Sequence, residues 1–239
     1  MENIEIYLNI ARLILGITIL GYASYTDIKT RKASNINWLV MGAIGAILLP
    51  VQYFTVGFEN PYILIFIPIM IGLVYLLFQL GLIFGGADAK ALMAIAILIP
   101  VQPTINQLPI WGESLMPASW TIFSNSVILF LFIPLALLFY NIIKRNIKFP
   151  HALIGYKTNI QTAREKFVWP LEKIKDGKTK FVYMPKNFDV DEELDELEKH
   201  GYTEIWVTPK LPFMIPLLAG FIFTFIFGDI LFALMQLFI

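Results

Sequence analysis

Cysteine is absent from this 239-residue chain, and histidine occurs only twice. The absence of cysteine excludes disulfide bonds, a thiol nucleophile and any zinc or iron–sulfur site with cysteine ligands. Two histidines are too few for most metal sites built from side chains alone, so we expect no metal ion and no cofactor. Charged residues make up 15% of the chain, whereas a soluble domain has about 25%. Because the net charge is zero, nucleic acid is not an expected partner.

The few charged residues are gathered in one segment, and the rest of the chain is apolar. Residues 144–210 hold 13 of the 18 Lys and Arg and 11 of the 18 Asp and Glu. A helix of about 20 apolar residues crosses the hydrocarbon core of a membrane. Six stretches fit this requirement: Ile4–Ala23, Asn35–Val51, Pro61–Phe84, Asp88–Val101, Trp120–Ile143 and Leu211–Phe238.

These stretches predict an α-helical integral membrane protein with six transmembrane helices. We expect a membrane domain at 1–143 that contains helices one to five, a small cytoplasmic α+β subdomain at 144–210 and the sixth helix at 211–239. The fourth stretch is short, because Pro100 and Pro103 end its apolar run. We expect a half-depth helix there, extended by irregular chain.

Lysine and arginine are distributed unevenly among the connections between these helices. The first, third and fifth connections carry them, at Lys29, Arg31, Lys32, Lys90, Lys144, Arg145 and Lys148. The second and fourth connections carry only Glu59 and Glu113. Because positively charged connections stay in the cytoplasm, we expect a multi-pass protein of the plasma membrane. Both termini would then lie outside, and segment 144–210 would lie in the cytoplasm.

Segment 144–210 has the residue patterns of strands and a helix. Lys180–Pro185 and Thr203–Pro209 are typical of strands, and Val190–His200 is typical of a helix that ends at Gly201. A β-α-β element is therefore predicted. Acidic residues crowd this helix, at Asp189, Asp191, Glu192, Glu193, Asp195, Glu196 and Glu198. Such a face attracts a basic peptide, but a solvated helix surface is the more common explanation.

Arg12 and Asp229 lie within the predicted membrane helices, where charge is costly and needs a reason. At 1.5 Å per residue, both lie about 12 to 13 Å from the outer ends of the first and sixth helices. We expect an ion pair between Arg12 and Asp229 that joins these two helices. The alternative is that water, backbone oxygens or snorkelling satisfy each side chain separately.

Asp27 and Asp88 face the opposite, cytoplasmic side of the membrane. Asp88 follows the small residues Gly85, Gly86 and Ala87, which let an extended peptide approach closely. Each aspartate alone has a structural explanation, as a helix N-cap for Asp88 and as a balance to nearby basic residues for Asp27. Together they favour a carboxylate dyad. Two carboxyl groups that share one proton activate water for attack on a peptide carbonyl, without a metal.

The pattern around these aspartates resembles the prepilin peptidases, a family of membrane aspartyl proteases of the Gly-x-Gly-Asp type, and in particular their archaeal branch, the preflagellin peptidases. It consists of Asp27-Ile28 with a basic run and Asn35 after it, and of Gly85–Asp88. Ala87 stands where the family pattern has glycine, and Ala33-Ser34 stands where many bacterial relatives have Ile-Pro. The cysteine tetrad of bacterial relatives is absent, which favours a peptidase without methyltransferase activity.

The resemblance implies that Asp27 and Asp88 are the catalytic residues of an endopeptidase that processes preflagellin or type IV prepilin-like precursors. Its partners would be precursors with a basic leader and a hydrophobic N-terminal helix, cut on the cytoplasmic side of the lipid bilayer. Three alternatives stay open. These are a presenilin-like intramembrane aspartyl protease, a small proton-coupled transporter that uses Asp88, Asp229 and Arg12, and a non-catalytic component of filament assembly.

Overall fold

The computed structural model describes residues 2–58, 60–83, 85–112, 114, 116–175, 177–182 and 190–238. The chain forms two compact units. The first unit contains residues 1–130 and 212–239, and the second contains residues 131–211. The long helix α5 (Ala118–Ile143) begins in the first unit and ends in the second.

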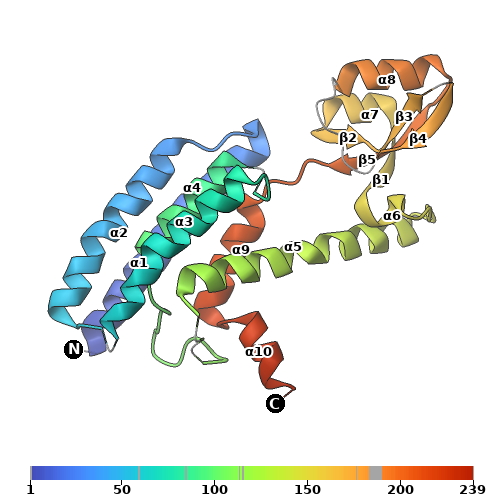
Figure 1. The fold of residues 1–239 in the computed structure, drawn as a ribbon. Coiled ribbons are helices and arrows are strands. Elements are labelled where there is room, and N and C mark those ends of the chain that lie inside the picture. The colour runs from blue at the N-terminus through green and yellow to red at the C-terminus, as the bar shows by residue number, and fades with distance from the viewer. Residues whose placement is uncertain are drawn as a thin grey trace. The chain divides into compact units, whose positions relative to one another are not determined.

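The first unit is built from helices (Figure 1). In chain order they are α1 (Glu2–Thr30), α2 (Asn35–Thr55), the 3-10 helix η1 (Pro61–Ile65), α3 (Phe66–Gln79), α4 (Gly86–Leu98), the beginning of α5, α9 (Met214–Ile226) and α10 (Ile230–Gln236). Side-chain caps begin two of these elements. The Ser34 hydroxyl accepts the Ile36 N–H at the start of α2, and Asn60 Oδ1 accepts the Tyr62 N–H at the start of η1.

Four helices of the described chain are long and apolar enough to cross a membrane, namely α1, α2, η1 with α3, and α5. Helices α9 and α10 pass the same test only as a pair, which makes a fifth candidate span. Helix α4 has 13 residues, so its length of about 20 Å is less than the hydrocarbon thickness. The predicted helical membrane protein is confirmed in outline, and the predicted number of six spans is not.

The predicted sixth helix, Leu211–Phe238, is not continuous in the structure. Helices α9 and α10 are bent by 53° at the break between them, which makes them a broken span or a re-entrant loop. Gly228 adopts φ +100°, a conformation that favours glycine, and Asp229 then caps the start of α10. Sequence hydrophobicity missed the break because the residues on both sides of it are apolar.

Helix α4 lies in the core of the first unit, which explains its apolar character in spite of its short length. Its buried residues occur on all sides of the helix: Ala89, Ala91, Leu92, Ala94, Ile95, Ala96 and Leu98. Helices α2 and α3 pack against it. At Gly45 of α2 the two backbones come into contact, since a Cβ added there would lie 2.7 Å from Leu98 Cα.

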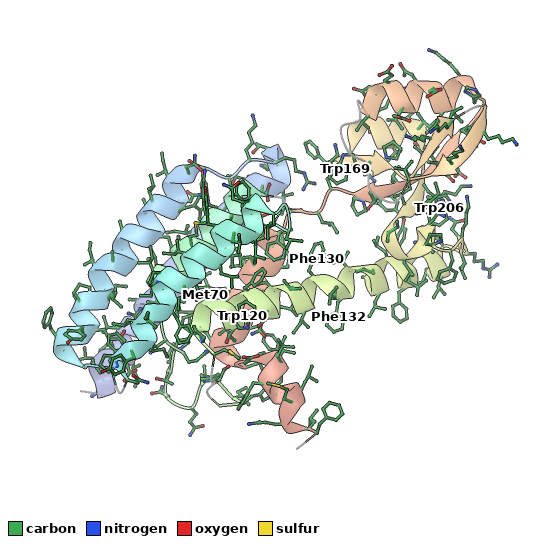
Figure 2. The ribbon with its side chains drawn as sticks, viewed as in Figure 1. Met70, Trp120, Phe130, Phe132, Trp169 and Trp206 are labelled. Carbon is green, nitrogen blue, oxygen red and sulfur yellow. The ribbon has the colours of Figure 1, made fainter. Side chains whose placement is uncertain are left out.

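Aromatic side chains join α5 to α9 within the first unit. Figure 2 shows Trp120 near the start of α5 and Phe130 farther along the same helix. The Phe130 ring lies 6.0 Å from the ring of Phe213, which precedes α9. Asn125 of α5, which is fully buried, donates to Thr224 Oγ1 of α9 at 3.0 Å. Segments about 90 residues apart in the chain are thus held side by side.

The second unit contains short helices and strands in addition to the end of α5. They are α6 (His151–Ile154), β1 (Tyr156–Asn159), α7 (Ile160–Glu165), β2 (Val168–Pro170), β3 (Glu172–Lys175), β4 (Lys178–Phe181), α8 (Val190–Lys199) and β5 (Glu204–Pro209). Strand β5 pairs antiparallel with β1 on one side and β2 on the other, and β3 and β4 form a separate hairpin. Leu194 and Leu197 of α8 are buried against Ile205 and Val207 of β5.

The structure confirms part of the prediction for this segment. Helix α8 matches the predicted helix, and Gly201 after it adopts φ +84°, as a glycine at a helix end does. Strand β5 also matches. The predicted strand Lys180–Pro185 is described only through Val182, and β4 ends at Phe181. The β-α-β element is wrong, because β4 and β5 lie in different sheets.

Candidate active site

Asp27 lies in the last turn of α1, where the chain is anchored from two sides. The Ser24 hydroxyl donates to the Met214 carbonyl oxygen at 3.0 Å, which fixes this end of α1 to the start of α9. Arg31, directly after the helix, adopts φ +55° and donates its N–H to the Asp27 carbonyl oxygen. The helix therefore ends one turn after Asp27. The Asp27 side chain is half-buried. Its backbone is therefore held in place, and its carboxyl group has access to water.

Asp88 is the third residue of α4, and its carboxyl group folds back over the residue that precedes the helix. Gly85 is the N-cap, with φ −96° and ψ 117°. A Cβ added to Gly85 would collide with Asp88 Oδ2 and would lie 2.8 Å from Asp88 Cγ. A side chain at position 85 would therefore displace the Asp88 carboxyl group. Glycine is needed here for space, since any residue can adopt this backbone conformation.

Gly86 and Ala87 differ from Gly85 in this respect. A Cβ added to Gly86 would make ordinary van der Waals contact, at 3.7 Å, with the Phe78 ring. Ala87 already carries a Cβ and is half-buried beside the core of the first unit. Of the three small residues before Asp88, only Gly85 is in contact with the carboxyl group itself.

The two aspartates lie in the same unit, within electrostatic range of each other. Asp27 lies close enough to Asp88 for the charge of one carboxylate to affect the other. Within the described part of the chain, neither side chain forms a hydrogen bond or an ion pair. Both are half-buried. The first unit thus contains two carboxyl groups with free lone pairs, and such groups are able to exchange protons with water or with a bound peptide.

Comparisons with known proteins place the chain in a family. The family model described as the type IV leader peptidase family matches residues 14–143, a range that includes both aspartates. The chain is also 32% identical to the preflagellin peptidase of Methanococcus voltae over 231 residues, which cover 90% of this chain and 94% of that protein. This chain belongs to the type IV leader peptidase family. The resemblance seen in the sequence is therefore confirmed, and the protein is a protease.

The remainder of this leader peptidase has its own match. The model described as archaeal peptidase A24 C-terminus type II matches residues 147–230. The preflagellin peptidases of Methanococcus maripaludis and Methanocaldococcus jannaschii are each 25% identical to the chain, cover 90% of it, and are themselves covered over 94% and 93% of their lengths. The similarity thus extends over both units, and the apolar helices fit a membrane protein.

Arg12 and Asp229 of the peptidase do not form the predicted ion pair, and each has other partners. Arg12 Nη1 donates to Asn9 Oδ1 at 3.1 Å, while its buried Nε and Nη2 have no hydrogen-bond partner among the described residues. Asp229 Oδ2 accepts from the Ser114 hydroxyl at 2.6 Å and from Thr121 at 3.3 Å. The sequence left open the alternative that other groups satisfy each side chain separately. This describes Asp229, whereas the described residues satisfy the hydrogen-bonding groups of Arg12 only in part.

Sequence reasoning missed the polar residues that support the break between α9 and α10. Asn125 donates to the Gly228 carbonyl oxygen at 2.8 Å and accepts the Ile230 N–H at 3.0 Å. Asp229 Oδ1 accepts the Phe232 N–H at 3.1 Å. These bonds satisfy backbone groups that the broken helix leaves free. The dipeptide Gly-Asp inside an apolar run was the signal that would have indicated the break.

The described residues contain no group of three His, Cys, Asp or Glu side chains that could hold a metal ion, in the second unit or elsewhere. The acidic helix of the second unit is partly neutralised. Arg164 lies within 3.9 Å of Asp191 and forms ion pairs with Asp195 and Glu198. Asp189, the first residue of the predicted acidic face, lies outside the described residues. Structural ion pairs thus account for part of this face.

Proposed function

We propose that this protein is a membrane aspartyl endopeptidase that removes a basic leader peptide from preflagellin or type IV prepilin-like precursors. Asp27 and Asp88 are its catalytic residues. The observation that supports this most directly is the pair of unbonded carboxyl groups within electrostatic range of each other, in a chain of the leader peptidase family. The relatives of the chain are preflagellin peptidases, which suggests the substrate.

The reaction needs one proton shared between the two carboxyl groups. When both are ionised they repel each other, so a close pair retains one proton over a range of pH. The ionised member removes a proton from a water molecule, whose oxygen attacks the carbonyl carbon of the peptide. The protonated member donates its proton to the carbonyl oxygen. As the C–N bond breaks, the member that took the proton from water gives it to the leaving amine. The other member takes a proton from a hydroxyl group of the tetrahedral intermediate as the C=O bond re-forms, so the dyad again holds one proton.

The sidedness of the reaction follows from the distribution of positive charge. Lys29, Arg31 and Lys32 follow Asp27, and Lys90 follows Asp88, so the positive-inside rule puts both aspartates at the cytoplasmic face of the plasma membrane. In this topology, residues 144–210 are cytoplasmic and both termini lie outside. Helix α4 then enters the membrane from the cytoplasm, and irregular chain after Leu98 completes the fourth of six crossings.

The decisive experiment uses membranes that contain the full-length protein and a preflagellin with a basic leader. We expect cleavage between the leader and the hydrophobic helix, and loss of cleavage in Asp27→Asn and in Asp88→Asn at unchanged protein abundance. Asp195→Asn, on the exposed face of α8, is the matched control and should cleave normally. Cleavage by both dyad variants would refute the proposed mechanism. Cleavage inside the hydrophobic segment would instead indicate an intramembrane protease.

A further inference from the structure

A hydrogen bond between side chains links α4, the helix that carries Asp88, to the start of α2, the helix that follows the one with Asp27. Lys90 Nζ donates to Asn35 Oδ1 at 2.8 Å, across 55 residues of sequence. Lys90 lies two residues after Asp88, on the first turns of α4. Asn35 is the first residue of α2, and a four-residue connection after α1 separates it from the helix that carries Asp27. The bond thus joins the start of α4 to the start of α2.

The position of this bond matters because α2 and α4 pack along their lengths. At the end of α4 and the middle of α2, Gly45 brings the α2 backbone against the backbone of Leu98. At their near ends, the Lys90–Asn35 bond holds the helix starts together. The two contacts together fix the translation of α4 along α2. Because α1 also packs against α2, these contacts favour one position of Asp88 relative to the last turn of α1.

The charge on Lys90 adds a second consequence. The ion pairs of the described residues do not include one between Lys90 and either aspartate. The ammonium group is held instead by a neutral amide oxygen. An ammonium group that paired with one member of a carboxylate dyad would stabilise its ionised form and oppose the sharing of a proton.

We propose that Lys90 and Asn35 are a positioning pair for the aspartate dyad, which keeps the two aspartates in register and keeps the Lys90 ammonium group bound to the Asn35 amide. This inference rests on the proposed function, because it assigns the pair a role in the same reaction. Neither residue touches the scissile bond. Their loss should therefore lower the rate of the chemical step and leave substrate binding nearly unchanged.

The test is a double-mutant cycle on the purified full-length protein in detergent, with a preflagellin as substrate. Lys90→Met and Asn35→Ala should each lower kcat by about tenfold, with KM within about twofold of the wild type. The double variant should be no slower than either single variant, because both remove the same bond. Lys90→Arg, which keeps a charged donor, should recover most of the rate. Lys199→Met, at the exposed end of α8, is the matched control and should keep the wild-type rate.

Other results would contradict the proposed positioning role of Lys90 and Asn35. Multiplicative losses in the double variant would show that Lys90 and Asn35 act independently, and a change in KM alone would indicate contact with the substrate. If Lys90→Met does not fold, Lys90→Arg and Lys90→Gln carry the test, since a rate near zero in the folded arginine variant contradicts the proposal. Asp27→Asn and Asp88→Asn are assayed in parallel. Activity in those variants refutes the proposed function, whereas a normal rate in Lys90→Met with inactive aspartate variants refutes only the pair.

Discussion

Two aspartates of the first unit follow a glycine-containing segment at the start of a helix, and their surroundings differ. Asp229 caps α10, and its carboxylate accepts hydrogen bonds from Ser114, Thr121 and the Phe232 N–H. The Asp88 carboxyl group makes no hydrogen bond to the described residues and remains half-exposed. A carboxylate with occupied lone pairs stabilises structure, whereas a free one exchanges protons. The hydrogen-bond partners of each carboxylate therefore distinguish the structural Asp229 from Asp88, whereas the glycine-containing segments before them do not.

The same substitution at both sites should have opposite consequences. Asp88→Ala should lower the rate of precursor cleavage by about a thousandfold, because it removes a group that transfers a proton. Asp229→Ala should leave the rate within a few-fold and should lower the free energy of unfolding by about 1–2 kcal/mol, because it removes a helix cap. Cleavage kinetics and thermal unfolding in detergent measure the two effects. A large stability loss in Asp88→Ala with residual activity would reverse the assignment.

The glycines before Asp88 offer a sharper form of the comparison. Gly85→Ala should lower kcat by about a hundredfold, because the added Cβ displaces the Asp88 carboxyl group. Gly86→Ala adds the same methyl group one residue later, where it only contacts Phe78, and should keep the rate within a few-fold. Steady-state kinetics of the two variants provide the measurement. Equal loss in both would mean that backbone flexibility, and not space for the carboxyl group, explains these glycines.

Asn125 allows a test of the structural side of this comparison, because its amide bonds the backbone at the break between α9 and α10. Asn125→Ala should lower the free energy of unfolding by about 3 kcal/mol, because it leaves the buried Gly228 carbonyl oxygen and Ile230 N–H without partners. At a temperature where the variant remains folded, the cleavage rate should stay within a few-fold of the wild type. Thermal unfolding followed by tryptophan fluorescence measures the loss. A stability equal to that of the wild type would show that water replaces the amide.

His151 in the second unit extends the comparison to a third titratable group without a hydrogen bond. It is 4% exposed and lies between the rings of Phe181 and Trp206, at 4.4 and 5.5 Å. Burial lowers the pKa of His151 below its usual value, and the positive charge of Lys148 lowers it further, whereas Glu172 acts in the opposite direction. The His151 ring forms no hydrogen bond with the described residues and is shielded from water. Asp27 and Asp88, in contrast, are only half-buried.

The sign of the expected pH effect follows from this lowered pKa. Below about pH 6.5 the unfolded chain binds a proton at His151 that the folded chain does not, so stability present above that pH is lost as the pH falls. His151→Phe keeps a ring between Phe181 and Trp206 and should reduce the loss of melting temperature between about pH 7 and pH 5. Trp206 fluorescence during thermal unfolding measures it. An identical pH dependence in the variant would assign the effect to other groups.

Several features of the molecule were predictable from the sequence, and they share a local cause. Apolar runs indicated the long helices α1, α2, α3 and α5, because the length needed to cross a membrane is visible in the composition. Helix α8 and its end at Gly201 follow from periodicity and one glycine. Asp27 and Asp88 were singled out as the candidate site because charge in an apolar chain needs a reason, and their catalytic role stays a prediction.

Other features depend on contacts between distant segments, and sequence patterns did not predict them. The separate hairpin of β3 and β4 and the pairing of β5 with β1 and β2 depend on which strands meet, which local propensity leaves open. The partners of Asp229 come from Ser114 and Thr121, more than 100 residues earlier in the chain. Equal depth in the membrane suggested Arg12 as its partner, but depth alone does not specify which helix faces reach each other.

The sequence by itself determined that the chain is a helical membrane protein with a charged segment and two aspartates near basic connections. Composition and motif spacing suffice for this, because each concerns residues close together in the chain. Tertiary structure alone decided that Asp27 and Asp88 lie within electrostatic range of each other, that Gly85 lies under the Asp88 carboxyl group and that Lys90 reaches Asn35. The physical reason is that these relations depend on how α1, α2 and α4 pack, and packing selects among helix rotations and translations that leave every local pattern unchanged.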